Sequence, residues 1–156
     1  MTHRTLFAVL LLMLCTVVSA QTKYATYAEF GGSGLLPTAN IEKRFTPHFA
    51  GRIGLSIVLF HDDGATALMP VVASYISHPV SNHHFEAGGG VLIAFGDTDD
   101  FDSRDGESNT NIAVTGLLGY RYQKPERGFM FRAGFTPIHY DEDITPIAGV
   151  SFGYNW

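Results

Sequence analysis

The sequence predicts an all-β fold, an eight-stranded antiparallel up-and-down barrel formed by residues 21–156. Three observations favour this fold. After residue 20 no capped segment repeats its apolar residues with the period of a helix. Glycine is frequent, with 17 in the chain, and apolar residues alternate with polar or small ones as in strands. Short turns also alternate with longer acidic connections, the pattern of an up-and-down barrel.

The first twenty residues have the features of a signal peptide. Arg4 opens a basic region, residues 6–18 form an apolar run, and residues 18–20 (Val-Ser-Ala) are small enough for signal peptidase. The run is shorter than the roughly 20 residues that a membrane-spanning helix needs. We therefore expect residues 1–20 to be a signal peptide cleaved after Ala20. Cleavage removes Cys15, the only cysteine, so the exported chain forms no disulfide.

Composition limits the class of protein. With 156 residues the chain has room for one domain, and a hydrophobic content of 46% excludes disorder as the default state. The formal net charge is −5, and loss of Arg4 with the signal peptide lowers it to −6. This acidic balance argues against nucleic-acid binding, which needs a basic surface.

Eight segments are expected to form strands. The glycine-rich residues 31–34 are also consistent with a bend in one long strand, 24–45. An even number of strands is needed if both ends of the barrel domain lie on the same side, so we predict two strands in this region. The eight segments are 24–31, 36–45, 48–60, 65–77, 84–95, 110–122, 128–138 and 144–156.

The connections between these segments fall into two classes. Three are compact: 46–47, 78–83 and 123–127. The other connections include 61–64, 96–109 and 141–143, which are acidic, and one of them is long. In an outer-membrane barrel, short turns face the periplasm and longer loops face outward. The sequence therefore predicts that the end with the compact turns faces the periplasm and the end with the acidic connections faces outward.

The strands separate their residues into two faces. In segment 48–60, Ile53 and Leu55 share a face, and Arg52 lies on the other with small residues. Segments 110–122 and 128–138 repeat this division with Arg121 and Arg132. Segment 65–77 is hydrophobic on both faces and cannot be oriented in this way. Toward the end of segment 144–156, aliphatic and aromatic residues alternate with small or polar ones.

The placement of charge indicates which face is inside. A charge that faces lipid at mid-depth costs roughly 2–4 kcal/mol, whereas a lumen can pair arginines with glutamates. We therefore expect a transmembrane β-barrel with its apolar faces outward. The alternative is a soluble periplasmic lipocalin-like carrier, with its apolar faces inward. The membrane interpretation predicts a lumen charge network of Glu29, Glu42, Arg44, Arg52, Glu86, Arg121 and Arg132.

Aromatic residues provide a second indication of a membrane. They are expected on the outward faces, close to the short turns, where an interfacial girdle forms in membrane barrels. These residues are Phe45, Phe49, Phe85, Tyr120, Tyr122, Phe129, Phe131, Tyr154 and Trp156.

The chain combines a signal peptide, an alternation of turns and loops, and the terminal residues 152–156 (Phe-Gly-Tyr-Asn-Trp). In these features it resembles the small eight-stranded outer-membrane β-barrel proteins of Gram-negative bacteria. Residues 40–45, 84–88 and 119–123 are similar to segments of a group of such barrels with no assigned activity. Nearly all of the chain after the signal peptide is covered, but no motif is specific for a reaction.

The resemblance implies a place and a fold. It implies insertion in the outer membrane, with outer-membrane lipid and lipopolysaccharide as neighbours. Phe152, Tyr154 and Trp156 resemble the terminal signal that the outer-membrane insertion machinery reads. We expect a structural or surface-binding role without enzymatic activity and without a cofactor. The ligand and the oligomeric state stay open.

One alternative is an outer-membrane lipid-modifying hydrolase. A serine nucleophile needs a histidine base within hydrogen-bond reach, and seven polar residues of suitable type lie close in sequence. The pair Ser81-Asn82 is similar to part of a lipid A deacylase motif, but the order His-x-Ser-Asn is absent. A turn is the simpler explanation of this segment. The seven residues are Ser74, Ser77, His78, Ser81, His83, His84 and Glu86.

No metal site is expected. His83 and His84 are neighbours and point to opposite faces of a regular strand, so both cannot hold one ion there. Residues 97–107 are acidic, but their spacing does not match an EF-hand loop. A solvated external loop is the simpler interpretation of that segment, and divalent-cation binding near lipopolysaccharide phosphates is the alternative.

Overall fold

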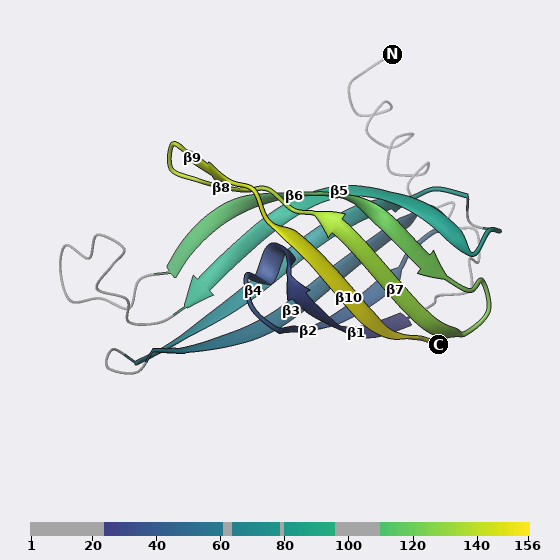
Figure 1. The fold of residues 1–156 in the computed structure, drawn as a ribbon, viewed down its shortest axis with the longest axis horizontal. Coiled ribbons are helices and arrows are strands. Elements are labelled where there is room, and N and C mark those ends of the chain that lie inside the picture. The colour runs from purple at the N-terminus through teal and green to yellow at the C-terminus, as the bar shows by residue number, and fades with distance from the viewer. Residues whose placement is uncertain (1–23, 61–63, 79, 96–109) are drawn as a thin grey trace, which may run out of the picture.

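The chain forms a closed antiparallel β-barrel of eight strands, as the sequence predicts (Figure 1). The computed structural model describes residues 24–60, 64–78, 80–95 and 110–156. Each barrel strand pairs with its neighbours in sequence, and pairing of β1 with β10 and of β5 with β6 leaves the sheet continuous. The barrel strands are β1 (Tyr24–Gly31), β2 (Thr38–Arg44), β3 (Phe49–Phe60), β4 (Gly64–Ile76), β5 (His83–Phe95), β6 (Thr110–Gln123), β7 (Gly128–Phe135) and β10 (Ala148–Asn155).

The two ends of the barrel differ in their connections. At the end that we call the short-turn end, compact turns join β2 to β3, β4 to β5 and β6 to β7. The described chain starts and finishes there, with hydrogen bonds of 2.9 Å in both directions between the backbones of Tyr24 and Trp156. We call the opposite end the long-loop end. The predicted signal peptide, residues 1–20, and the acidic segment 97–107 lie outside the described residues.

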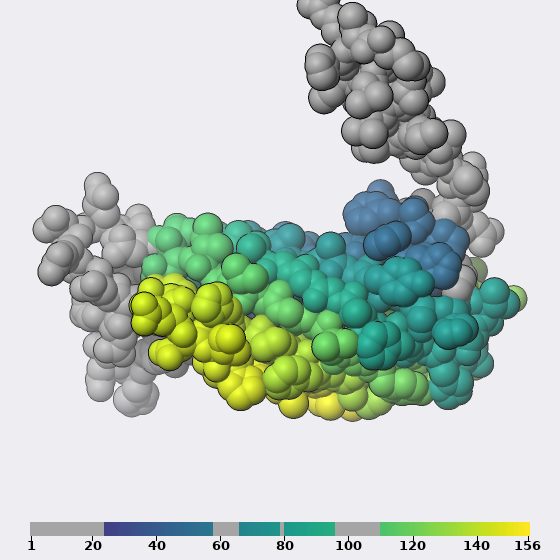
Figure 2. Space-filling view, turned by 90° about the horizontal axis from the view of Figure 1, so that it is seen from above, coloured from purple at the N-terminus to yellow at the C-terminus, as the bar shows by residue number. Residues whose placement is uncertain are grey.

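Prolines interrupt the last two predicted strands. Segment 128–138 ends as a barrel strand at Phe135, because Pro137 has no N–H to donate across the sheet. Pro146 interrupts segment 144–156 in the same way. The residues beyond the breaks form a short hairpin of β8 (Ile138–Tyr140) and β9 (Asp143–Thr145), and β8 pairs with β6 at Val114 and Thr115. Figure 2 shows this hairpin (yellow) on the outside of the long-loop end, beside β6 (green).

Residues 24–45 form two strands, so the expected count of eight is confirmed. A short 3₁₀ turn, η1 (Gly32–Gly34), joins them. Gly31 and Gly32 have φ values of 71° and 70°, a left-handed conformation that glycine adopts without steric penalty. They reverse the chain within a few residues, and η1 is buried against β3, β4 and β10. The glycine-rich segment is therefore a turn that folds into the barrel.

Alternate residues of each strand face the interior. In β3, Arg52 and Ser56 are buried, whereas Ile53, Leu55 and Ile57 are 48–62% exposed on the outer face. The strand that could not be oriented from sequence, β4, turns Leu68, Pro70, Val72, Ser74 and Ile76 inward. The apolar faces thus point out of the closed barrel.

The interior has two layers. Toward the short-turn end it is filled by charged side chains, together with a small cluster of Ala25, Tyr27 and Met130. Toward the long-loop end it is apolar, with a cluster of Leu68, Leu92, Ala113 and Ile138. Among the described residues, no helix has the length and hydrophobicity to cross a membrane.

Close approach of neighbouring strands requires glycine at Gly90. A Cβ atom there would meet the backbone carbonyl oxygen of Val71 on β4. At the adjacent Gly89 the nearest atom to an added Cβ is the Thr115 carbonyl oxygen, 3.3 Å away. We predict that Gly90→Ala lowers the free energy of unfolding by about 1–3 kcal/mol through overpacking. The measurement is the urea midpoint of protein refolded into phosphatidylcholine vesicles.

Gly89→Ala is the matched control for Gly90→Ala. It adds the same methyl group one residue away, and we expect it to change stability by less than about 1 kcal/mol. Equal losses in the two variants would show that contact with β4 is not what demands glycine at residue 90.

Candidate functional site

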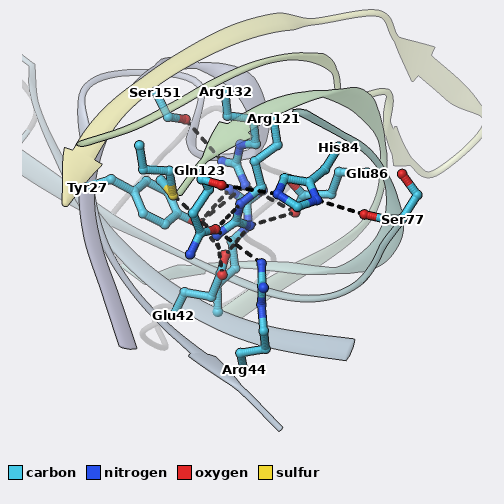
Figure 3. Close-up of polar contacts among 12 residues, drawn as sticks. Tyr27, Glu42, Arg44, Ser77, His84, Glu86, Arg121, Gln123, Arg132 and Ser151 are labelled. Carbon is cyan, nitrogen blue, oxygen red and sulfur yellow. Dashed lines mark hydrogen bonds and ion pairs between the residues drawn. The ribbon is translucent and has the colours of Figure 1, made fainter. Parts of the chain in front are cut away.

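The charged side chains of the interior form the most conspicuous polar feature of the molecule (Figure 3). They come from six strands, and the two-residue alternation of each strand turns them inward. All seven residues predicted for the lumen are buried there, and we call them the charge cluster. They are Glu29 on β1, Glu42 and Arg44 on β2, Arg52 on β3, Glu86 on β5, Arg121 on β6 and Arg132 on β7.

Five ion pairs join six of these residues into one chain. Glu29 lies 3.1 Å from Arg52 and 2.8 Å from Arg132. Glu86 lies 3.6 Å from Arg132 and 3.5 Å from Arg121. Arginine and glutamate therefore alternate along the chain, so that each buried charge has an opposite charge beside it.

The tightest contact is at the end of this chain. Arg121 binds Glu42 with both terminal nitrogens: Nη2 donates to Oε1 at 2.5 Å and Nη1 donates to Oε2 at 2.9 Å. Its Nε donates to Gln123 Oε1 at 2.7 Å. Bidentate pairing with a carboxylate fixes the guanidinium in one orientation. Arg121 is completely buried, so this contact is shielded from water.

Tyr27 connects the two halves of the cluster. Its hydroxyl accepts hydrogen bonds from Arg132 Nη1 at 3.3 Å and Arg52 Nη1 at 3.4 Å, and it donates to Glu42 Oε2 at 3.5 Å. The Arg132 guanidinium also lies 4.9 Å from the centre of the Tyr27 ring, within range of a cation–π interaction. Sequence reasoning missed Tyr27 and Gln123 because they carry no charge. Both share the inward parity of a charged neighbour two residues away, which is the signal that could have found them.

Arg44 stands outside the chain of ion pairs. It lies within 4.0 Å of no carboxylate among the described residues, and its Nη2 donates to Gln123 Oε1 at 3.2 Å. Its Nε is buried without a hydrogen-bond partner. The cluster holds four arginines and three glutamates, so Arg44 supplies its surplus positive charge.

The arrangement of the charge cluster is suited to stabilising the barrel and not to catalysis. Its guanidinium groups bind carboxylate, hydroxyl, amide and thioether groups of the protein, including Ser33 Oγ, Ser151 Oγ and Met130 Sδ. Side chains fill the interior of an eight-stranded barrel, and toward the short-turn end these side chains are charged. The charge cluster therefore cross-links six strands from the inside.

The serine and histidine residues considered for catalysis are not arranged as a nucleophile and base. Ser77 Oγ accepts from the backbone N–H of Phe85 at 2.8 Å, and Ser81 Oγ accepts from that of His83 at 3.0 Å. His84 is buried, with its ring nitrogens 2.7 Å and 3.2 Å from the carbonyl oxygens of Ser77 and Gln123. These hydroxyls thus bind the backbone of the turn.

Ser77, His78, His83 and His84 line one surface pocket, and Ser74 and Glu86 lie apart from it. Ser74 and Glu86 are buried in the interior, whereas His78 and His83 are exposed at the turn. His83 Nδ1 lies 2.6 Å from the Tyr120 hydroxyl on the outer face. In the part of the chain that the structure describes, no three histidine, cysteine or acidic residues are grouped to hold a metal ion.

The outer surface at the short-turn end carries a belt of aromatic rings. Tyr24 and Trp156 stack with centroids 5.2 Å apart, and Phe49 meets Tyr75 edge-on at 5.6 Å. The predicted outward residues are all on this surface; Tyr122 and Phe131 are half-buried and the others exposed. They are Phe45, Phe49, Phe85, Tyr120, Tyr122, Phe129, Phe131, Tyr154 and Trp156.

The last strand contributes to this belt. Phe152, Tyr154 and Trp156 are 46–59% exposed on the outer face of the barrel. Phe152 packs against Phe131 of β7 with centroids 5.3 Å apart. The inward residues of the same strand are Ser151 and Asn155, and both are buried.

Comparison with known proteins places the fold. No family model matches the sequence, and no curated protein matches it either. The N-terminal β-barrel domain of Pseudomonas aeruginosa OprF is similar in structure, with a TM-score of 0.61 and 14% identity over 86% of this chain and 96% of that one. The Yersinia pestis outer membrane protein Ail in a phospholipid bilayer nanodisc is similar with a TM-score of 0.52 and 13% identity, over 87% and 100% of the two chains. At these identities the likeness shows the fold alone.

Removal of one charge from the chain of ion pairs should destabilise the barrel. Arg121→Met leaves Glu42 buried without its bidentate partner, and such a change costs about 3–5 kcal/mol. We expect this loss in the free energy of unfolding, measured by urea titration in phosphatidylcholine vesicles.

Arg44→Met is the matched control for Arg121→Met. It removes the same group from the arginine that has no carboxylate partner and leaves three positive and three negative charges. We expect a loss of about 1 kcal/mol, the value of one hydrogen bond. If Arg44→Met were as destabilising as Arg121→Met, the ion-pair chain would not be what stabilises the interior.

Proposed function

We propose that this chain is an outer-membrane β-barrel protein with a structural or surface-binding role and no enzymatic activity. One observation carries the proposal. The faces of the closed barrel are the reverse of those in a water-soluble barrel: arginine and glutamate are inside, and isoleucine, leucine, valine and phenylalanine are outside. A bilayer is the solvent that suits this arrangement, since a lipid-facing surface must be apolar.

The same observation opposes a soluble periplasmic lipocalin-like carrier. A carrier of that type would keep polar residues on its outer face, in contact with water. Here Ile41 on β2, Ile57 on β3, and Ile112 and Val114 on β6 are more than half exposed. Soluble monomers rarely leave so continuous an apolar surface in water.

The aromatic belt supports an orientation in the membrane. Tyrosine and tryptophan are enriched at membrane interfaces, where an apolar ring meets polar headgroups. Lys43 extends its ammonium group to 5.6 Å from the Tyr24 ring and 5.9 Å from the Phe45 ring at the same level. In our proposal this belt meets the inner leaflet on the periplasmic side, and the long-loop end meets lipopolysaccharide.

The absence of enzymatic activity belongs to the same proposal. It is supported by the hydroxyls of Ser77 and Ser81, which are engaged with backbone N–H groups. It is also supported by the charge cluster, whose groups bind one another. A lipid-modifying hydrolase would require changes in lipid A or phospholipid on overexpression that are lost with Ser81→Ala or His84→Ala.

The membrane location has a direct test. We predict that the chain expressed in a Gram-negative host stays in the membrane pellet after a carbonate wash. Without heating it should migrate on a gel as a faster, compact band, because a closed barrel resists detergent. A soluble carrier would leave with the wash and show a single band at both temperatures.

The terminal strand has a separate test. We propose that Phe152, Tyr154 and Trp156 are read by the outer-membrane insertion machinery. Deletion of residues 154–156 should then abolish the compact band in cells, which is checked by gel mobility of the membrane fraction. Trp156→Phe keeps an aromatic at the same place and should insert normally. Normal insertion of the truncated chain would remove the proposed signal.

A further inference from the structure

The apolar layer of the interior contains a cavity of about 560 Å³ at the long-loop end. Its walls are formed mainly by six apolar side chains from three barrel strands, β8 and the β1–β2 connection: Leu35, Leu36, Leu68, Leu92, Ala113 and Ile138. A volume of this size is within the range of small-molecule sites. We call this cavity the apolar pocket.

The turn η1 directly precedes two residues of the pocket wall, Leu35 and Leu36. Gly32, Ser33 and Gly34 are buried inside the barrel. Ser33 Oγ accepts a hydrogen bond of 2.8 Å from Arg52 Nη2, which ties the turn to the cluster. The charge cluster therefore anchors the turn that leads into the pocket wall.

Leu35 reaches the pocket in a strained conformation. Its φ is 65°, in the left-handed region, which is strained for a residue other than glycine. Strain of this kind persists at ligand-contacting positions when the surroundings hold it. Here it places two successive leucines, Leu35 and Leu36, at the pocket.

The barrel wall is open beside the pocket. Pairing of β2 with β3 ends at Ala39 and Leu55, so residues 56–60 of β3 have no β2 partner. On the other side β9 pairs with β8 alone among the described strands. Figure 1 shows the β8–β9 hairpin and the β3–β4 pair diverging at this end, with η1 between them. Leu35 and Leu36, which line the pocket, are exposed, so an alkyl chain can reach the pocket from outside the barrel.

The rim of the pocket is acidic. Asp141 and Asp143 line it on the β8–β9 hairpin, and both are exposed. Neither takes part in an ion pair within the described part of the chain. Carboxylates at the mouth attract a cationic group and repel an anionic one.

We propose that the apolar pocket binds a cationic amphiphile with a single alkyl chain. The chain lies among Leu68, Leu92 and Ile138, and the cationic group lies at Asp141 and Asp143. The apolar walls select the chain, and the two carboxylates select the sign of the head. This site goes beyond the proposed structural role.

The test uses three probes with the same chain: decyltrimethylammonium, decanol and decyl sulfate. The full barrel is refolded into phosphatidylcholine nanodiscs, and each probe is titrated below the concentration that dissolves them. The readout is the methyl NMR signals of Leu68, Leu92 and Ile138. Methyl signals of Ile53 and Leu55, which face outward, report simple partition into lipid in the same spectrum.

The cationic probe should shift the pocket methyl signals and saturate, while the outward methyl signals change without saturation. Decyl sulfate should bind about tenfold more weakly or worse, since two exposed charges are each worth up to about 1 kcal/mol. Equal binding of the cationic and anionic probes would overturn the assignment of the head. Unshifted pocket signals with all three probes would overturn the site.

Two rim variants test the carboxylates. Asp141→Asn and Asp143→Asn together should weaken binding of the cationic probe about tenfold and leave decanol binding unchanged. Asparagine tolerates the left-handed φ of 55° at residue 141. Glu142→Gln is the matched control, because it lies between them, is exposed and does not line the pocket. If Glu142→Gln weakened binding of the cationic probe equally, the effect would come from the overall negative charge of the hairpin and not from the two carboxylates at the pocket.

Ala113→Phe tests the cavity itself. The added ring fills the pocket and should abolish the saturable shifts of all probes. Val114→Phe places the same ring on the outer face of the same strand and should bind like the unmodified protein. Heat-modifiable gel mobility checks that both variants fold. Saturable shifts that survive in a folded Ala113→Phe barrel would place binding elsewhere.

Discussion

The burial of paired charges on one parity of the strands constrains the whole barrel. Six of the eight barrel strands turn an arginine or glutamate into the charge cluster. A shift of one residue in any of these strands would move its charge to the apolar outer face and leave a buried partner unpaired. The two strands without such a charge, β4 and β10, are held by pairing on both sides, and Ser151 of β10 also binds Arg132. The cluster thus fixes the register from within.

The fold could be predicted from sequence largely because charge marks the inner face. Arg52, Arg121 and Arg132 each lie opposite an apolar run, and that parity orients their strands. The pairing partners could not be predicted, since Arg121 meets Glu42 across 79 residues of sequence only after the barrel has closed. Tyr27 was missed for a related reason: its role depends on lying between Arg52 and Arg132 in space.

At the long-loop end, the alternation of apolar residues is not sufficient to predict where the strands end. The alternation of apolar residues continues through Pro137 and Pro146. Each proline lacks the N–H group that would donate a hydrogen bond to the neighbouring strand, and the barrel strands are interrupted there. The glycine-rich residues 31–34 indicate a turn or a bend, but nothing in the local sequence indicates that the turn folds inward. Its direction follows from contacts with Arg52 and β4, which are distant in sequence.

The barrel strands differ in length from one side of the barrel to the other. β3 to β6 have 12 to 14 residues, whereas β1, β2, β7 and β10 have 7 or 8. A strand needs about 9–11 residues to cross the hydrocarbon core. One side of the barrel is therefore taller than the other. In a bilayer, the location that we propose, hydrophobic mismatch on the low side would be relieved by tilting of the barrel or thinning of the adjacent leaflet. Lipids or proteins that favour a thin bilayer would then gather beside the short strands β1, β2, β7 and β10.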